Sequence, residues 1–525
     1  MSLKLACVQM RARSAEHRGE ALRSALRMID AAADGGARMA LLPETFYPSY
    51  YLGGIDPAWS WREAFSALSE KAAERRIFLA AGIVLEDGGS LRNAAVLWGP
   101  DGKECLRTYK SNLWHFDERY VEPGLSFDVA ETPWGPVGMM ICADGRIPEI
   151  ARILALKGAR LILDPTNLVA SGRDPSRLSS PQLEYMLCAR AAENGLWIAV
   201  ANKVGLEAES VLNCGGSCVI DAFGEKVASL GPDREDILFV DVDPDAAPHA
   251  LPARTPEKYG ALAKKTEETG AYKNLSAPLS PLAEDELFLG VAQFSFEGTT
   301  DYVKRAARVL TRSADQGASL LCLPGTLSCS GSEIAASLSS SLAGEKCMAA
   351  CAVSEPASAG RRLVLFDGCG AVASLPEGAY TPVETSAGKI GVVFGDEGWN
   401  PEPVRCLMLE GAEIVLWYGA FEDERGRSII EKIARTRASE NRVCIVAAFS
   451  GPTRESFIVP PSGAVAASAL PGESQTVFAL LRRSDCRWKT VTPGTDIVLG
   501  RHPEAYLPLT EARPFRRRCS TSGTH

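Results

Sequence analysis

The sequence predicts an α/β protein built from two tandem domains, and three observations support this prediction. The chain has 525 residues, which is enough for two domains of ordinary size. With 46% apolar and 23% charged residues, its composition is that of a globular protein. Short apolar segments with the pattern of strands alternate with amphipathic helical segments, and this alternation occurs twice along the chain.

The two halves of the chain are similar in six collinear segments. "LKLACVQM" at 3–10 returns as "LFLGVAQF" at 287–294, and "GPVGMMICADGRIPE", which ends at Glu149, returns as "GKIGVVFGDEGWNPE", which ends at Glu402. The other four pairs, in order with these, are "DGGARMALLPE" and "DQGASLLCLPG", "KGARLIL" and "EGAEIVL", "CARAAENGLWIAVAN" and "RTRASENRVCIVAAF", and "RTPEKY" and "RHPEAY". Six matches in one order indicate a repeated domain.

The predicted elements of the first copy follow from the period of its apolar residues. Strands are expected at 3–9, 38–42, 77–85, 93–98, 136–141, 160–163, 196–202, 216–220 and 237–242, and helices at 16–34, 61–75, 148–157 and 180–194. We place the first domain at 1–245 and the second at 286–510. Residues 246–285 have the composition of a linker, 330–342 that of a variable loop, and 511–525 that of a disordered basic tail.

Charge and cysteine content exclude several classes of function. The net charge of -9 and the pI near 5.4 argue against a nucleic-acid or membrane surface, because either needs a cationic face. The N-terminus has no pattern of a signal peptide, and no segment approaches the roughly 20 apolar residues of a membrane span. The 15 cysteines form no CxxC pair, which favours a reducing cytosol over disulfides or a metal site. We expect a soluble, cytoplasmic protein.

Cys142 lies at a predicted strand-to-helix turn. It follows the apolar run "VGMMI" and precedes "ADGRIPE", in which Pro148 suits the first position of a helix. Such a turn exposes the sulfur at the carboxyl edge of the sheet, near the positive end of a helix, and this should lower the pKa of the thiol. The backbone N–H of Ala143 would then serve as the donor to an oxyanion. Taken alone, Cys142 could equally be a core cysteine.

A cysteine nucleophile needs a base, and none of the five histidines follows a strand in a comparable way. Glu44 ends the predicted strand "RMALLPE", so its carboxylate should share the sheet edge with Cys142. Lys110, in "RTYKSNLWHFDERY", would add a cation. Each of these two charged residues alone is more typical of an exposed position, so only the combination indicates a catalytic site.

Together with four sequence blocks, these residues resemble the carbon-nitrogen hydrolase family, also called the nitrilase superfamily. The blocks are "LLPE", "YK" followed by "FDERYVEPG", "GMMICADGRIPE" and "GGSCVIDAFGEKVA", in the order of that family. The resemblance covers nearly all of 3–260 and, in degraded form, 287–510. It implies a four-layer αββα sandwich for each domain, with Glu44 as general base, Lys110 as electrophilic ammonium and Cys142 as nucleophile.

The resemblance also implies further site residues. Glu118 matches the second acid that family members often hold beside the thiol, if this segment is one residue short; an ungapped count from Gly124 gives Asp117 instead. "CADGRIPE" is similar to the amidase and carbamoylase branches, whereas nitrile hydrolases have Trp-Glu after the cysteine. Arg146, which matches one of a pair of arginines that bind a substrate carboxylate, and Asn167 are candidate substrate-binding residues.

We therefore expect a hydrolase that cleaves a non-peptide C–N bond of a small linear amide or an N-carbamoyl compound through a thioester on Cys142. No metal, nucleotide or other cofactor is expected, because the sequence has no P-loop, no GxGxxG behind a strand and no HExxH. Acyl transfer from the same intermediate to an amine is one alternative. A non-catalytic scaffold or binding protein is another.

The second copy lacks the three residues of this constellation. Gly325 aligns with Glu44 and Gly395 with Cys142, the interval between them is 70 residues instead of 98, and no lysine occurs in 347–388. We expect a degenerate, inactive domain. The resemblance implies that its remaining segments are those that pair subunits in the family, so we predict a pseudo-dimer within one chain, open to further homo-oligomerisation.

Overall fold

The computed structural model describes residues 2–55, 59–170, 174–247, 251–277, 284–355, 360–420, 424–450 and 455–512. These residues form two compact units. Unit 1 comprises the described residues up to Leu251 together with Thr492–Thr495 and Ala512, and unit 2 comprises the described residues of Pro252–Val491 and Asp496–Glu511. The basic run at 516–518 lies outside the described residues.

Unit 1 contains two sheets. The first has the order β11-β10-β1-β2-β3-β4-β5, with β14 paired to β1, and the second has the order β13-β12-β9-β8-β7-β6. The strands of the first sheet are β1 (Leu3–Arg11), β2 (Met39–Leu41), β3 (Phe78–Asp87), β4 (Ser90–Trp98), β5 (Glu104–Tyr109), β10 (Lys203–Glu207), β11 (Val211–Cys214) and β14 (Asp236–Val242). Those of the second are β6 (Val129–Thr132), β7 (Gly135–Met139), β8 (Leu161–Pro165), β9 (Trp197–Ala201), β12 (Cys218–Ile220) and β13 (Lys226–Ser229).

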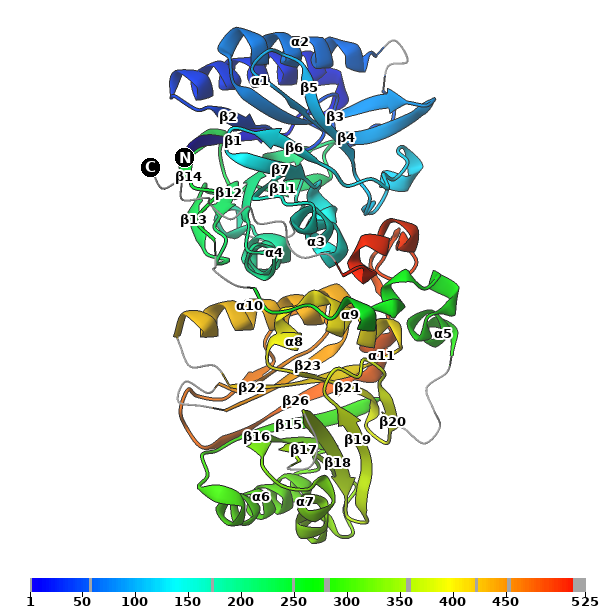
Figure 1. Cartoon of the computed structure of the whole chain (residues 1–525). Coiled ribbons are helices and arrows are strands. Elements are labelled where there is room, and N and C mark those ends of the chain that lie inside the picture. The colour runs from blue at the N-terminus through cyan, green and yellow to red at the C-terminus, as the bar shows by residue number, and fades with distance from the viewer. Residues whose placement is uncertain are drawn as a thin grey trace, which may run out of the picture. The chain divides into compact units, whose positions relative to one another are not determined.

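Helices cover the outer faces of both sheets in unit 1, as Figure 1 shows. Helices α1 (Arg18–Asp34) and α2 (Trp61–Arg75) pack on the first sheet, while α3 (Pro148–Leu156) and α4 (Leu187–Asn194) pack on the second. Shorter helical turns are η1 (Ala15–His17), η2 (Asp117–Arg119), η3 (Cys142–Arg146), η4 (Pro175–Arg177) and η5 (Gln182–Met186). The order of layers is helix, sheet, sheet, helix, which confirms the predicted αββα sandwich.

Parallel pairing brings the carboxyl ends of key strands together. β1, β2 and β3 are parallel neighbours in the first sheet, and β7, β8 and β9 are parallel neighbours in the second. Residues that follow β2, β7 and β8 therefore emerge at corresponding edges of the two sheets. This topology positions the site described below.

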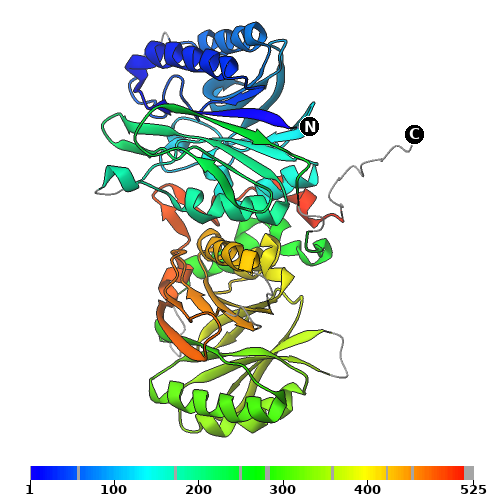
Figure 2. The same cartoon turned by 90° about the vertical axis from the view of Figure 1, so that its left-hand side faces the viewer.

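Unit 2 repeats the arrangement with the sheets β19-β18-β17-β16-β15-β26 and β20-β21-β22-β23-β24-β25. Its strands are β15 (Glu286–Gln293), β16 (Leu320–Leu327), β17 (Met348–Ser354), β18 (Arg361–Asp367), β19 (Gly370–Pro376), β20 (Val383–Thr385), β21 (Gly388–Phe394), β22 (Ile414–Ala420), β23 (Cys444–Ser450), β24 (Phe457–Val459), β25 (Ala467–Ser468) and β26 (Gln475–Arg482). Helices α6 (Gly298–Asp315) and α7 (Gly331–Leu338) cover the first sheet, and α9 (Pro401–Leu409) and α10 (Glu424–Asn441) cover the second (Figure 2).

One pair of equivalent glutamines shows how closely the two units repeat each other. The side-chain oxygen of Gln9 accepts the N–H of Ser217 at 2.9 Å, and its nitrogen donates to two loop carbonyls. The side-chain oxygen of Gln293 accepts the N–H of Ser456 at 2.8 Å, and its nitrogen also donates to two loop carbonyls. In both units one buried amide thus satisfies backbone groups of the other sheet and of a distant loop.

The expectation of a variable loop at 330–342 is wrong. Helix α7 and the turn η9 (Ser339–Leu342) occupy this stretch. Ile334, Leu338 and Leu342 are buried there, and their spacing of four residues places them on one face of a helix. The abundance of serine and alanine obscured this apolar stripe.

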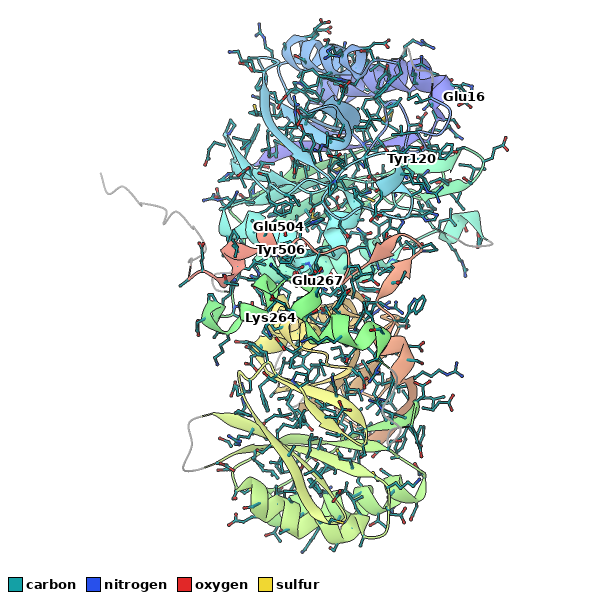
Figure 3. All side chains as sticks on the ribbon, turned by 90° about the vertical axis from the view of Figure 1, so that its right-hand side faces the viewer. Glu16, Tyr120, Lys264, Glu267, Glu504 and Tyr506 are labelled. Carbon is teal, nitrogen blue, oxygen red and sulfur yellow. The ribbon has the colours of Figure 1, made fainter. Side chains whose placement is uncertain are left out.

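The stretch expected as a linker contains regular structure within unit 2. It includes η6 (Pro256–Lys258), η7 (Gly260–Ala263), η8 (Thr266–Glu268) and α5 (Gly270–Ser276). Arg501 donates to the carbonyl of Leu262 at 2.6 Å, and Lys264, labelled in Figure 3, forms an ion pair with Glu410. Capping of α5 by Thr269 adds local stability to the stretch.

Four residues from late in the sequence belong to unit 1. They join β27 (Thr490–Thr492) to β28 (Thr495–Asp496), and the hydroxyl of Thr495 accepts the N–H of His115 at 2.8 Å. In the described part of the chain, no helix is long and apolar enough to span a bilayer.

Candidate active site

Cys142 stands at a sharp turn between β7 and α3. The turn η3 begins at Cys142, and α3 begins at Pro148, as the sequence predicts. Cys142 has a φ of 52°, a left-handed conformation that is uncommon for a residue with a side chain. A strained backbone of this kind needs support from its surroundings, and such residues cluster at functional sites.

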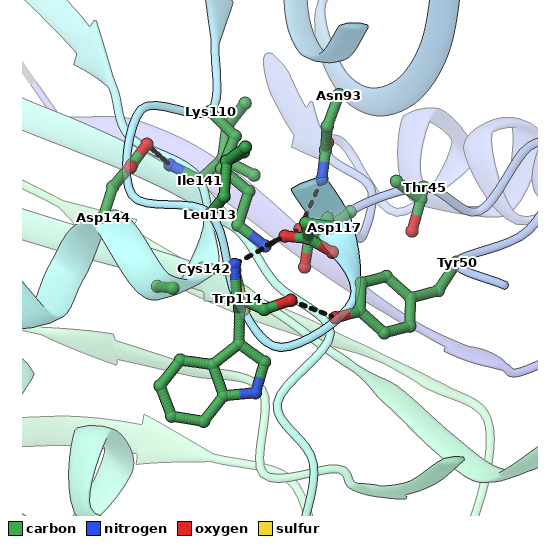
Figure 4. A network of polar contacts seen from close by, with 12 residues as sticks. Thr45, Tyr50, Asn93, Lys110, Leu113, Trp114, Asp117, Ile141, Cys142 and Asp144 are labelled. Carbon is green, nitrogen blue, oxygen red and sulfur yellow. Dashed lines mark hydrogen bonds and ion pairs between the residues drawn. The ribbon is translucent and has the colours of Figure 1, made fainter. Parts of the chain in front are cut away.

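Three charged side chains lie together beside this turn, in the network of Figure 4. Lys110 Nζ lies 2.8 Å from Glu44 Oε1 and 2.7 Å from Asp117 Oδ2. Asn93 Nδ2 donates to the same oxygen of Glu44 at 2.7 Å. Glu44 and Lys110 are at most 1% exposed, so water screens their interaction little. The structure thus brings Glu44 and Lys110 together, as the sequence predicts.

Burial and charge set the protonation of this cluster. Burial alone would lower the pKa of Lys110, but the carboxylates of Asp117 and Glu44 raise it well above its ordinary value, so Lys110 is an ammonium. Burial raises the pKa of the Cys142 thiol well above its ordinary value, and the charge of Glu44 raises it further against the opposing effect of Lys110. The expected lowering of the thiol pKa is therefore wrong, because desolvation outweighs the helix end.

Two buried carboxyl groups fix the turn itself. Asp144 accepts the N–H groups of Ile141 at 3.0 Å and of Asn112 at 2.7 Å, and so ties the cysteine turn to the loop that follows Lys110. Asp164, at the end of β8, accepts the N–H of Cys142 at 2.9 Å. Burial raises the pKa of Asp144 to about 7 and that of Asp164 well above its ordinary value.

A buried arginine holds the far side of the turn in each unit. Arg190 forms an ion pair with Glu193 at 2.7 Å and donates to the carbonyl of Gly145 at 3.1 Å. In unit 2, Arg437 pairs with Glu440 at 2.9 Å and donates to the equivalent carbonyl, that of Gly398, at 3.2 Å. Because both units keep this clamp, it belongs to the turn rather than to any chemistry at the cysteine.

One predicted position needs correction. Asp117, not Glu118, lies beside Lys110, and Asp117 is buried whereas Glu118 is exposed. Asp117 Oδ2 also accepts the N–H of Trp114 at 2.9 Å, which closes the turn η2 and points the carboxylate inward. The ungapped count from Gly124 gave this residue, so the assumed one-residue deletion caused the error.

The remaining candidates, Asn167, Ala143 and Arg146, have different surroundings. The backbone N–H of Asn167 hydrogen bonds to the sulfur of Cys142 and lowers its pKa, while the Asn167 side chain is buried. The backbone of Ala143 is buried, and its carbonyl accepts the side chain of Asn112 at 2.8 Å. The guanidinium of Arg146 lies 5.1 Å from the ring centre of Trp114.

Several buried polar atoms around the cluster have no hydrogen-bond partner among the described residues. Within the described residues, the buried atoms Glu44 Oε2, Thr45 Oγ1, Asn93 Oδ1 and both side-chain polar atoms of Asn167 have no hydrogen-bond partner. A small cavity of about 10 Å³ lies beside Thr45, Asn93 and Asp117. Buried polar groups are normally paired, so these atoms mark a place where a polar ligand would bind. Among the described residues, no cluster of three metal-ligating side chains exists.

Sequence reasoning missed Asn93, Asp144 and Asp164. Asn93 is the first residue of the predicted strand 93–98 and has no motif of its own. Asp164 offered a signal, because it directly follows the predicted strand 160–163, which comes after the cysteine strand, and parallel neighbours end at one edge. Asp144 also offered a signal. It lies two residues after Cys142 in the predicted strand-to-helix turn, and Asp side chains at turns often accept nearby backbone N–H groups.

Different side chains occupy the equivalent place in unit 2. A Cβ atom at Gly325 would lie 2.9 Å from the ring of Phe296, and one at Gly395 would lie 3.4 Å from Arg361. Arg361 in turn forms an ion pair with Glu377. The turn itself is retained, because Gly395 has a φ of 50°.

Comparisons with known proteins identify the family of the chain. A profile of the carbon-nitrogen hydrolase family matches residues 4–249 and 353–488. The chain is 31% identical over 239 residues to omega-amidase NIT2 of Xenopus tropicalis, covering 43% of this chain and 84% of the relative. It is 30% identical over 225 residues to a nitrilase of Pyrococcus abyssi, covering 41% of this chain and 81% of the relative.

Among solved structures, an amidase of Nesterenkonia sp. AN1 is similar with a TM-score of 0.41 and 28% identity, covering 46% of this chain and 90% of the other. The profile match spans more than half of the residues of this chain. The chain therefore belongs to the carbon-nitrogen hydrolase family. It is an amidase-like hydrolase that acts on C–N bonds.

Proposed function

We propose that Cys142 is the nucleophile, Glu44 the general base and Lys110 the cation that stabilises the oxyanion. The buried contact between Glu44 Oε1 and Lys110 Nζ at 2.8 Å, beside the strained turn of Cys142, carries this proposal. Asp117 acts as a positioning residue, because it holds the ammonium from the other side at 2.7 Å.

The raised pKa of the Cys142 thiol requires a base close by, because a buried thiol of this kind is protonated at neutral pH. Glu44 has one oxygen committed to Lys110 and Asn93, and its second oxygen, Oε2, has no partner among the described residues. We assign the proton transfer to Oε2. Its orientation is fixed by the two hydrogen bonds at Oε1.

The reaction proceeds in two halves. Glu44 takes the thiol proton, Cys142 sulfur attacks the carbonyl carbon, and Lys110 stabilises the oxyanion. The C–N bond then breaks, and the leaving amine takes the proton from Glu44. A water molecule next gives its proton to Glu44 and attacks the thioester carbon, the C–S bond breaks, and the proton returns to the sulfur. The products are an amine or ammonia and a carboxylic acid. When the substrate is an N-carbamoyl compound, the products are an amine and carbamic acid.

The site favours a small linear amide or N-carbamoyl compound. The cavity of about 10 Å³ beside Asn93 and Asp117 has room for about one water molecule. The buried amide of Asn167 offers a donor and an acceptor to the carboxamide of a substrate. Arg146 would attract a carboxylate at the far end of the substrate.

We infer that the second half is non-catalytic. Gly325 and Gly395 carry no base and no nucleophile, and Phe296 and Arg361 lie where side chains at those positions would project. The pseudo-dimer stays a prediction, which expression of residues 1–285 alone can test. We also infer a reducing cytosol as the location, because the cysteine-rich sequence lacks paired motifs.

The proposal is tested by trapping the acyl-enzyme. A Glu44→Gln variant is incubated with a panel of small amides and N-carbamoyl amino acids, and the mass of the intact protein is measured. We expect a mass increase equal to the acyl group less the thiol hydrogen that it replaces, located on Cys142 by peptide mapping, because the variant can be acylated slowly but cannot activate water. Substrates that give a trapped adduct are then assayed with the unchanged enzyme.

The adjacent residues Asp117 and Glu118 offer a matched pair of variants that tests whether Asp117 positions Lys110. Asp117→Asn should lower kcat on the order of 10²-fold, because it removes the charge that holds Lys110. Glu118→Gln, one residue away and exposed, should leave kcat unchanged. Equal losses in the two variants, or an adduct on a cysteine other than Cys142, would contradict the proposal.

A further inference from the structure

A second cavity lies in unit 2, far in sequence from the catalytic residues. Its volume is about 640 Å³, within the range of small-molecule sites. Helix α6 forms one wall and the beginning of β26 forms the other, and the helix lies along the face of the sheet that contains β15 and β26 (Figures 1 and 2). The catalytic mechanism uses none of the residues that line it.

Three arginines of α6 line this cavity. Arg305, Arg308 and Arg312 are spaced by three and four residues, which places their guanidinium groups along one face of the helix. From the first to the third the helix rises by roughly 10 Å. Arg305 contacts Asp301 through Nε at 2.9 Å, while Arg308 and Arg312 are exposed toward solvent. The three arginines create a positive potential at this place, although the whole protein has a net charge of -9. Anions would therefore be attracted to this part of the surface.

Polar and aromatic groups complete the lining. Ser474, Gln475 and Thr476 contribute from the start of β26, and Gln316 contributes from the residue that follows α6. Phe478 lines the base and stacks on Phe288 with ring centres 4.9 Å apart. The cavity thus combines guanidinium groups with hydroxyl and amide donors, which is the chemistry that binds phosphate or carboxylate oxygens.

The first copy of the domain provides an internal comparison. In the alignment that matches Asp34 with Asp315, Arg308 corresponds to Arg27 of α1, and Arg305 and Arg312 correspond to Ser24 and Ala31. Helix α1 therefore has one arginine where α6 has three.

The residue that follows the helix also differs between the two units. Gly35 of unit 1 corresponds to Gln316, and a Cβ at Gly35 would lie 2.5 Å from the ring of Phe239. In unit 1 the ring of Phe239 leaves no room for a side chain at Gly35, whereas unit 2 has a glutamine at the equivalent position. The cation row and the larger side chain are thus features of the copy that lacks the catalytic residues.

We propose that the second half binds a small polyanion in this cavity, through Arg305, Arg308 and Arg312. Two or more phosphate or carboxylate groups would span the row of guanidinium groups, and the apolar part of the ligand would lie toward Phe478. This gives the degenerate domain a binding function of its own, independent of chemistry at Cys142.

Calorimetric titration of the full chain tests the proposal, with pyrophosphate as the phosphate probe and citrate as the carboxylate probe, in buffer of low ionic strength. We expect one site per chain and a dissociation constant that rises with added NaCl, because salt screens exposed charges. The double variant Arg308→Gln/Arg312→Gln should weaken binding at least tenfold. Arg27→Gln, at the equivalent exposed position of α1, should not change it.

The two probes distinguish the source of the anionic oxygens. Tight binding of pyrophosphate alone assigns a phosphorylated ligand, and tight binding of citrate alone assigns a polycarboxylate; either outcome supports the site if the double variant weakens it. Absence of saturable binding by both probes overturns the proposal. So does binding that Arg27→Gln weakens as much as the double variant does. Unchanged thermal unfolding of the variants confirms that these surface changes leave the fold intact.

Discussion

Cys142 and Gly395 occupy the same turn of the repeated fold, and both have a positive φ, 52° at the cysteine and 50° at the glycine. A left-handed conformation is unstrained for glycine and costs roughly 1–2 kcal/mol for other residues. The copy without a nucleophile has the residue that suits the turn, whereas the catalytic copy retains a strained side chain there. The strain at Cys142 is therefore associated with function.

This relationship predicts the stability of variants at the turn. Cys142→Gly should be more stable than Cys142→Ala by about 1 kcal/mol, because both lose the thiol but only glycine relieves the positive φ. The reverse change in unit 2, Gly395→Ala, should be destabilising by a similar amount. Urea unfolding curves measure the differences. A Cys142→Ala variant as stable as Cys142→Gly would show that the turn is not strained.

The role of Glu44 is predicted to appear in the alkylation rate of Cys142. The charge of Glu44 raises the pKa of the thiol, so if its only effect were electrostatic, Glu44→Gln would make Cys142 react faster with iodoacetamide. As a general base, Glu44 removes the proton, and its loss should slow the reaction at least tenfold. Mass spectrometry of the modified peptide at pH 7 separates the two cases.

The exposed Cys105 provides the internal control for this measurement. The charges that act on its thiol are those of Asp101 and Glu104 rather than Glu44, so its rate should be the same in both proteins. Faster modification of Cys142 in the Glu44→Gln variant would refute the assignment of Glu44 as the base.

Asp144 is predicted to make stability depend on pH. Burial raises its pKa to about 7 in the folded state, against roughly 3.9 in an unfolded chain. Between these values the folded state binds more protons, so the contribution of Asp144 to the free energy of unfolding should fall as pH rises from about 4 to about 7. The difference in urea midpoint between the unchanged protein and Asp144→Asn should shrink over this range.

The exposed Asp233→Asn serves as the control for that comparison, since it alters a carboxylate at the surface. A difference between the unchanged protein and Asp144→Asn that stays constant or grows with pH would contradict the predicted sign.

Thr495 is predicted to affect catalysis from a distant place in the sequence. Its hydroxyl accepts the N–H of His115 at 2.8 Å and donates to the carbonyl of Leu113 at 3.2 Å, on the loop that leads to Asp117. Thr495→Val keeps the shape but removes both hydrogen bonds, each worth about 1 kcal/mol. We expect kcat to fall several-fold and thermal stability to decrease, whereas Thr492→Val should have little effect. Steady-state kinetics and thermal unfolding measure both.

Much of the fold and part of the site could be predicted from the sequence. Strand ends, helix periods and the position of Pro148 depend on local pattern, so the turn at Cys142 and the helix at 61–75 were predicted close to their observed bounds. The internal repeat identified Gly325 and Gly395 as the positions of the missing residues. Glu44, Lys110 and Cys142 could be chosen because each stands in a block with its own pattern.

Other properties depended on which residues the tertiary structure brings together. Whether Asp117 or Glu118 points toward Lys110 depends on how the turn η2 closes, and a sequence does not determine that orientation. The pKa of the Cys142 thiol was predicted in the wrong direction, because a helix end acts locally whereas burial comes from the whole fold. Strand pairing brings Asn93 and Asp164 to the site. Local pattern determines where chemistry-bearing residues stand, whereas packing determines what surrounds them and therefore which charges they hold.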